Sequence, residues 1–256
     1  MGLGTTKSAK RDAVFVDLKF AEPVGFRQTI GRTAREGVKE GERKFDYQYQ
    51  MHDFVEGDLA GFRVKEEPRY DDPSQKDLVG YATIRDTDGG PDVVIRFPLL
   101  GQAGRKMVGL LAAAEHAKAG AVHLYTNFAD AGTRIGDKVL EKPQAYLNCK
   151  VGNSRGEKLV PLYYGEDGAP LLDDKGHPKP LPMGVKHVIA RKEVWDFSDA
   201  DNQTASTAAK LMLLLQPKQG VTDAHTEGHE DAHADAHADA HAEIDLNEAA
   251  NVAMRP

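Results

Sequence analysis

Five histidines recur at every fourth position in the stretch HTEGHEDAHADAHADAHAEIDL, residues 225–246, and this spacing could bind a metal. On a helix, side chains four residues apart share one stripe, and histidine pairs at that spacing can coordinate zinc. The stretch has no large apolar residue between Val221 and Ile244, so it cannot orient the outer partners that a metal site needs. We therefore interpret it as a disordered acidic tail with only adventitious metal affinity. The histidines are His225, His229, His233, His237 and His241.

The rest of the chain offers little for catalysis. Cys149 is the only cysteine, which excludes an intramolecular disulfide and is typical of a reducing, cytoplasmic location. It lies in an alternating, strand-like run, where a cysteine is more often a small buried hydrophobe than a nucleophile. The chain has no phosphate-binding loop of the Walker type, and no pattern places two carboxylates as an acid–base pair. We expect a protein that is not an enzyme and that has no cofactor and no metal.

Basic and aromatic residues recur on the less apolar side of five strand-like runs. Alternate side chains of a strand point to opposite faces, so Tyr81 and Arg85 share a face that excludes Ala82. A protein that binds single-stranded nucleic acid needs this combination, because cations follow the phosphates while flat rings stack on bases. The other interpretation is an ordinary solvated sheet face, which also carries Tyr, Lys and Arg. The candidate nucleic-acid-binding residues are Arg63, Lys65, Tyr81, Arg85, Arg96, Tyr125, Tyr146 and Lys150.

These residues lie on a predicted order of three strands, one helix and two strands. Residues 54–70 read as a strand and a loop, and 78–99 as a hairpin around a Gly-rich turn. Residues 104–120 have the apolar spacing of an amphipathic helix, and 121–128 and 144–152 alternate as strands. This is the element order of an OB-fold, a five-stranded barrel with a helix between its third and fourth strands. The predicted fold class is mainly β with one or two helices, as an OB-fold-like barrel; an α+β sandwich is the alternative.

Flanking segments complete the predicted organisation. Residues 1–53 read as a strand and a basic flexible arm, and the barrel domain with a Pro-rich hairpin spans 54–200. Within it, the run 186–197 predicts a final strand whose Trp195 fills the core. A short helix over 201–220 then leads to the tail. The basic residues of the arm are Arg27, Arg32, Arg35, Lys39, Arg43 and Lys44.

Charge separates the tail from the body. Residues 221–256 hold nine acids and one base, a net −8, while the whole chain carries −7. Residues 1–220 therefore hold 32 bases and 31 acids, a net +1, so any nucleic-acid affinity needs bases gathered on one face. A tethered polyanion competes with nucleic acid for such a face at high effective concentration. We expect the tail to modulate binding.

Two quoted stretches carry a family resemblance. Over residues 54–164 the chain resembles the OB-fold single-stranded DNA-binding proteins of bacteriophages and mobile elements. The stretches that carry the resemblance are DLVGYATIRDTDGGPDVVIRFPLLGQAGRKMVGLLAAAEHAKAGAVHLYTNFA and QAYLNCKVGNSRGEKLVPLYY. The resemblance implies sequence-independent binding and protection of single-stranded DNA in replication or recombination, in the cytoplasm of a bacterial host if a phage encodes the chain. It also implies that the candidate residues contact DNA and that the acidic tail recruits replication or recombination proteins. Bacterial members end in an acidic stretch with an apolar tip, whereas this chain ends in AANVAMRP; EIDLNEA at 243–249 is the nearest substitute.

The expected partners follow from this interpretation. Single-stranded DNA is the principal one, replication or recombination proteins are reached through the tail, no membrane is involved, and a homo-oligomer is left open. The competing function is a structural or assembly protein of the virion type, built on a similar β-barrel without nucleic-acid binding. Salt separates the two, because a DNA binder that neutralises several phosphates loses affinity steeply as salt rises.

Overall fold

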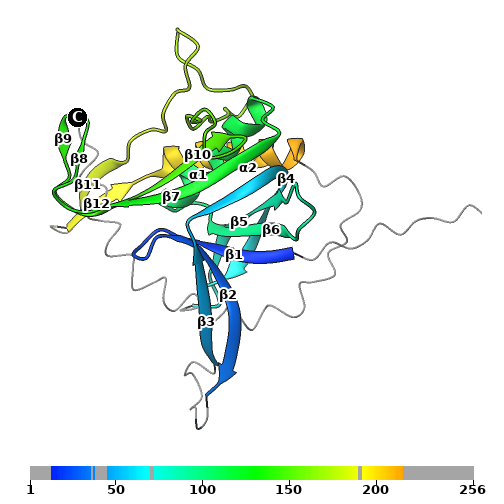
Figure 1. Cartoon of the computed structure of the whole chain (residues 1–256). Helices are drawn as coiled ribbons and strands as arrows, with labels where there is room; N and C mark the ends of the chain where they lie inside the picture. Colours follow the sequence, from blue (N-terminus) through cyan, green and yellow to red (C-terminus); the bar gives the residue numbers. More distant parts are fainter. Residues whose placement is uncertain (1–12, 36, 38–44, 70–71, 190–191, 216–256) are drawn as a thin grey trace, which may run out of the picture.

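The computed structural model describes residues 13–35, 37, 45–69, 72–189 and 192–215. They form a mainly β protein with two helices and one large curled sheet (Figure 1). The elements in chain order are β1 (Ala13–Lys19), β2 (Gly25–Ala34), β3 (Phe45–His52), β4 (Phe54–Pro68), β5 (Lys76–Arg85), β6 (Asp92–Pro98), α1 (Gln102–His116), β7 (Ala121–Ala129), β8 (Arg134–Ile135), β9 (Lys138–Val139), β10 (Gln144–Val151), β11 (Val185–Ile189), β12 (Lys192–Asp196) and α2 (Ser198–Leu214).

The large sheet has eight strands in the order β10-β7-β4-β5-β6-β1-β2-β3. Its first five members are the strands predicted for the barrel, and the helix α1 lies between β6 and β7 as expected. The five do not close on themselves in the described part of the chain, because β1 pairs in parallel with β6 on the side where a barrel would close. The mainly β class is confirmed, and the five-stranded barrel is not.

The arm is a long antiparallel ribbon of β2 and β3. Its base joins the sheet through β1, which pairs antiparallel with β2. From there the ribbon projects away from the sheet and the helices (Figure 1). A bulge between Thr29 and Gly31 shifts the register once along the pair, so that Thr29 faces Tyr49 while Arg32 faces Tyr47.

The core lies on one face of the sheet and is covered by the helices. Alternate strand residues such as Phe62, Ile95 and Leu124 point to this face and are fully or almost fully buried. In α1 the expected apolar positions at i, i+3, i+4 and i+7 are all buried, but so is every other residue from Met107 to Ala114, so the middle of the helix is enclosed on all sides. The expected positions are Met107, Leu110, Leu111 and Ala114.

The predictions for residues 159–197 hold only in part. The Pro-rich segment is extended and held by isolated bridges, including Tyr164 with Pro170, so a turn-containing arm is present but not a regular strand pair. The single final strand is wrong, because the run folds back on itself and Val185 of β11 pairs with Asp196 of β12. Trp195 in the core is also wrong. The separate two-stranded sheet leaves Trp195 half-buried, with its ring 6.4 Å from that of Phe197.

The helix predicted over 201–220 corresponds to α2, which spans Ser198–Leu214, while 216–220 lie outside the described residues. Leu211 and Leu215 are buried and Leu214 is exposed. Asp201 in its first turn binds Arg105 of α1 at 2.7 Å, and this ion pair fixes the two helices to each other. The acidic tail at 221–256, predicted to be disordered, lies outside the described residues, as do Lys39, Arg43 and Lys44 of the arm.

Candidate nucleic-acid interface

All eight predicted DNA-binding residues lie on one face of the large sheet, the face turned away from the buried core. Strand register shows this directly: Arg63 of β4, Tyr81 of β5 and Arg96 of β6 are paired neighbours in one row across the sheet. The same row continues through Asp17 of β1 to Arg27 of β2. Because paired residues share a face, one surface runs from β10 to β3. We call it the outer face.

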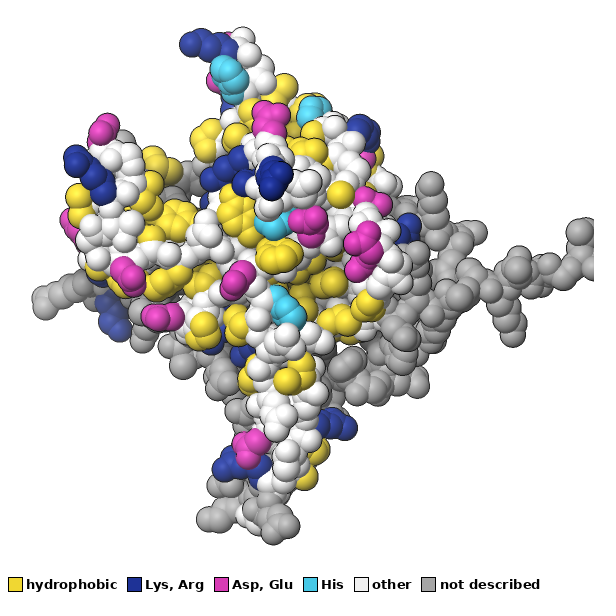
Figure 2. All heavy atoms as spheres, viewed as in Figure 1, with side chains coloured by type: hydrophobic (Ala, Val, Ile, Leu, Met, Phe, Trp, Pro, Cys, Tyr) yellow, Lys and Arg dark blue, Asp and Glu magenta, His cyan; other side chains and the backbone are white. Residues whose placement is uncertain are grey.

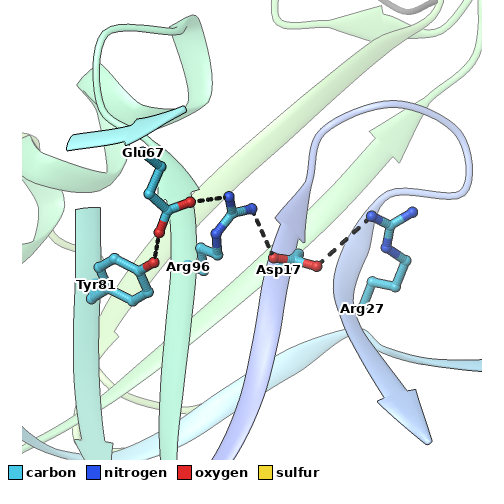
Figure 3. Close-up of polar contacts among 5 residues, drawn as sticks. All are labelled: Asp17, Arg27, Glu67, Tyr81 and Arg96. Atoms are coloured by element: carbon cyan, nitrogen blue, oxygen red, sulfur yellow. Dashed lines mark hydrogen bonds and ion pairs between the residues drawn. The ribbon is translucent and has the colours of Figure 1, made fainter. Parts of the chain in front are cut away.

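Two of the eight residues are buried on the outer face, within a polar network (Figure 3). The Tyr81 hydroxyl donates to one oxygen of the Glu67 carboxylate, and the Arg96 guanidinium binds the other oxygen. Arg96 also donates to Asp17 at 3.4 Å, and Asp17 forms an ion pair with Arg27 at 3.8 Å. Since the Arg96 side chain is only 7% exposed, this network joins strands and leaves little of the guanidinium for a ligand. Tyr81 and Arg96 therefore hold the surface together.

Arg63, Lys65 and Arg85 keep more of their surface in solvent. Arg63 is half-buried and its guanidinium carbon lies 4.9 Å from the centroid of the Tyr81 ring, a cation–π contact. Lys65 is half-buried on the same face two residues further along β4. Arg85 is exposed at the end of β5, opposite Asp58. These three side chains have cationic heads that can reach a phosphate.

Tyr125, Tyr146 and Lys150 come together where β4, β7 and β10 lie side by side. The Lys150 ammonium nitrogen lies 5.5 Å from the centroid of the Tyr125 ring. Tyr146, half-buried on the adjacent strand, donates its hydroxyl to Gln144 at 2.8 Å, and burial raises the pKa of Tyr146. Strand register sets Tyr146 opposite Asn127, on the same face as Tyr125 and Lys150.

The same place holds two further rings that the sequence analysis did not select. Phe54 is 54% exposed, and its ring centroid lies 5.0 Å from that of His123. His123 in turn lies 5.4 Å from Tyr125, and its Nδ1 is 2.7 Å from a carboxylate oxygen of Glu56. Strand register sets Phe54 directly opposite Tyr125, which explains the cluster. We call Phe54, Tyr125, Tyr146 and Lys150 the β4–β7–β10 surface.

A second group of rings lies on the outer face of the arm and was also missed. Phe45, Tyr47 and Tyr49 alternate along β3, and successive ring centroids are 6.3 Å apart at both steps. The Arg27 guanidinium carbon lies 4.7 Å from the Tyr49 centroid and that of Arg32 lies 4.9 Å from the Phe45 centroid. Figure 2 shows Lys and Arg side chains near the far end of the arm. The signal was in the sequence, as aromatic residues at every second position of FDYQY.

Two stretches have the residue spacing of catalytic motifs. GNSRG at 152–156 has the GxSxG spacing, which in a nucleophile elbow connects a strand to a helix. Here it follows β10 but leads into an extended segment, with Leu159 donating to the carbonyl of Cys149. HEDAH at 229–233 has the HExxH spacing and lies outside the described residues. Within the described residues, no three His, Cys, Asp or Glu side chains are grouped to hold a metal ion.

Cys149 is buried as predicted, and burial raises the pKa of its thiol to about 12. A thiol with this pKa stays protonated near neutral pH, so it is a weak nucleophile. Neither helix of the described chain has the length and apolar character needed to cross a membrane.

Comparison with protein-family models, with curated proteins and with solved structures finds no match to this chain.

Proposed function

We propose that this protein binds single-stranded DNA without sequence preference, on the outer face of its sheet. The observation that carries the proposal is the β4–β7–β10 surface, where three strands bring Phe54, Tyr125 and Tyr146 together with the ammonium group of Lys150. A base that lies flat on an aromatic ring gains about 1–3 kcal/mol, whatever its identity, and a nearby cation meets the phosphate. Rings and a cation on one open sheet surface are what such a ligand requires.

The proposal assigns different roles to the eight predicted residues. Tyr125, Tyr146 and Lys150 contact bases and phosphates, and Arg63, Lys65 and Arg85 extend the phosphate path across β4 and β5. Tyr81 and Arg96, which are buried, act as positioning residues through Glu67. In this proposal β4, β5, β6, β7 and β10, with α1, form an OB-fold-like unit whose β6 edge is occupied by β1. The roles in replication or recombination, and the tail as a modulator or recruiter of partners, belong to the same proposal.

Fluorescence anisotropy with labelled oligo-dT and a matched duplex tests the proposal at several salt concentrations. We expect the full chain to bind oligo-dT more tightly than the duplex, because a duplex hides its bases from the rings. A plot of the logarithm of affinity against the logarithm of salt concentration should have a slope of about −3, because four basic side chains can each meet one phosphate. They are Arg63, Lys65, Arg85 and Lys150. Tyr125→Ala should weaken oligo-dT binding by roughly 5- to 150-fold through the loss of one stacking ring.

Two control variants sharpen this measurement. Tyr125→Phe keeps the ring and should bind nearly as tightly as the unchanged protein, because stacking does not use the hydroxyl group. Lys175→Ala removes an exposed base from a turn outside the large sheet and should leave the affinity unchanged. An unchanged chain that retains no oligo-dT even at low salt would contradict the proposal.

One observation favours the competing function of a structural or assembly protein. The small β11–β12 sheet exposes apolar side chains, with Val188 71% exposed and Val185 and Val194 also in solvent. Val185 and Val194 share one face of this sheet, and neighbouring exposed apolar groups are typical of surfaces that associate with another protein. An assembly protein would retain no oligonucleotide and would form particles of defined mass, which light scattering detects in the same samples.

A further inference from the structure

The outer face of the arm repeats the chemistry of the β4–β7–β10 surface at a second place. Three rings and two guanidinium groups occupy this part of the β2–β3 ribbon, and strand pairing sets Arg32 opposite Tyr47. We propose that the arm is a second binding site for single-stranded DNA, in which Phe45, Tyr47 and Tyr49 each stack one base. The inference rests on the proposed function and extends it to a separate element.

The spacing of the rings selects a single strand over a duplex. Successive ring centroids are 6.3 Å apart, because side chains on one face of a strand repeat every two residues. Neighbouring bases along one strand of a duplex are only about 3.4 Å apart and are stacked on each other. A strand that places one base on each ring is therefore stretched to nearly twice the duplex spacing. Only an unpaired strand can extend in this way and offer its bases.

Arg32, which is exposed, supplies a charge that the bound strand needs, and Arg27 holds the row of rings in place. Arg32 lies over Phe45 and Arg27 lies over Tyr49, so each end of the row of rings has a guanidinium group within 5 Å. A guanidinium plane stacks on bases as well as on rings, and its fork of donors binds phosphate oxygens. The Arg27 side chain is only 11% exposed and forms an ion pair with Asp17, so it positions Tyr49 and connects the arm to the polar network, while Arg32 is the cation that can reach a phosphate. The arm therefore has both parts of a stacking site, rings and a cation.

The two sites lie on the same face of the curled sheet but far apart along it. Six strand-to-strand steps separate β7 from β3 in the sheet order, a path of about 29 Å at the usual strand spacing. A short oligonucleotide can occupy only one site, whereas a longer one can reach both. Simultaneous binding makes the second contact intramolecular and raises the affinity without any new kind of contact. The arm therefore predicts an affinity that keeps rising with oligonucleotide length.

The test compares fluorescein-labelled oligo-dT of about 4 and about 30 nucleotides. Four bases at the 6.3 Å ring spacing span about 19 Å, less than the path between the two sites, whereas the longer oligonucleotide exceeds the roughly 4–16 nucleotides that one such sheet face covers. The arm variant is Tyr47→Val with Tyr49→Val, since valine keeps the strand propensity and removes the ring. We expect this variant to lose at least about 25-fold in affinity for the long oligonucleotide, because two stacked bases are lost. The advantage of the long over the short oligonucleotide should largely disappear.

Matched variants on the same strand isolate the stacking contribution. Gln48→Ala with Gln50→Ala alters the exposed residues on the other face of β3 and should bind like the unchanged chain. Tyr47→Phe with Tyr49→Phe keeps both rings and should retain the length dependence. Circular dichroism and thermal unfolding verify that every variant folds.

The failures of the two proposals are distinguishable. If the unchanged chain binds oligo-dT and the valine variant binds it equally well at both lengths, the arm site is overturned while the sheet site stands. If the phenylalanine variant loses as much affinity as the valine variant, stacking on the arm is overturned. If the valine variant changes only the particle mass in light scattering, the arm serves self-association instead. If the unchanged chain binds no oligo-dT, both proposals are overturned.

Discussion

Replacing Arg96 with methionine is expected to destabilise the folded chain by about 3 kcal/mol. The side chain is 7% exposed and bridges Glu67 and Asp17, whose own side chains are 20% and 17% exposed. Its loss leaves Glu67 with the Tyr81 hydroxyl and Asp17 with Arg27 at 3.8 Å. Removal of one partner from a buried pair costs about 3–5 kcal/mol, and we take the lower end because both carboxylates keep another partner and some solvent.

A double-mutant cycle measures whether the network acts as a unit. Glu67→Leu alone leaves Arg96 with Asp17, whereas the double variant removes both members of the pair, so the two losses should not add. We expect a coupling free energy of about 1–3 kcal/mol from urea unfolding followed by circular dichroism. Arg85→Met, at an exposed base on the neighbouring strand, should change stability by no more than about 0.5 kcal/mol. Single losses that add to within about 0.5 kcal/mol would refute the coupling described for this network.

Two further predictions concern the core. Gly109→Ala should destabilise the chain by about 1–3 kcal/mol in thermal unfolding, because a Cβ there would lie 2.6 Å from the Tyr163 ring, whereas Gly120→Ala meets nothing within 4 Å and should cost far less. Cys149, with its pKa raised to about 12 by burial, should resist a thiol reagent at pH 8 in the folded chain and react quickly in denaturant. Because the thiol ionises more readily when the chain is unfolded, its contribution to stability is complete below about pH 8.5 and is lost as the pH rises toward 12. Rapid labelling of the folded protein would contradict the burial of Cys149. A free energy of unfolding that stays flat over this pH range would contradict it as well.

Alternation made the faces of the strands predictable. In AVHLYTNF, Val122 and Leu124 alternate with His123 and Tyr125, and a strand with a buried face has only one way to orient such a sequence. The helix spacing in α1 was informative for the same reason. These local patterns identified which side of each strand faces the core and which faces outward.

The partners of each strand were not predictable, because pairing depends on contacts between distant residues. Asp17 and Arg96 are 79 residues apart in the sequence, and no local pattern in β1 or β6 predicts that these two strands pair in parallel. The sequence alone predicts that Tyr81 and Arg96 contact a ligand, because it does not show the β1–β6 pairing. In the structure both side chains are buried and bound in a polar network with Asp17 and Glu67. The clustering of Phe54 with Tyr125 likewise follows from the β4–β7 register, which the sequence does not state.

The position of β1 between β6 and β2 has a consequence for synthesis on the ribosome. Residues 13–52 are translated before β6, yet β1 cannot complete its hydrogen bonds until Asp92–Pro98 has emerged and paired with it. During that interval the nascent ribbon offers unpaired backbone groups along β1, which other chains can bind. The placement of β1 between β6 and β2 anchors the arm, and it also makes the nascent chain depend on the prompt synthesis of β6.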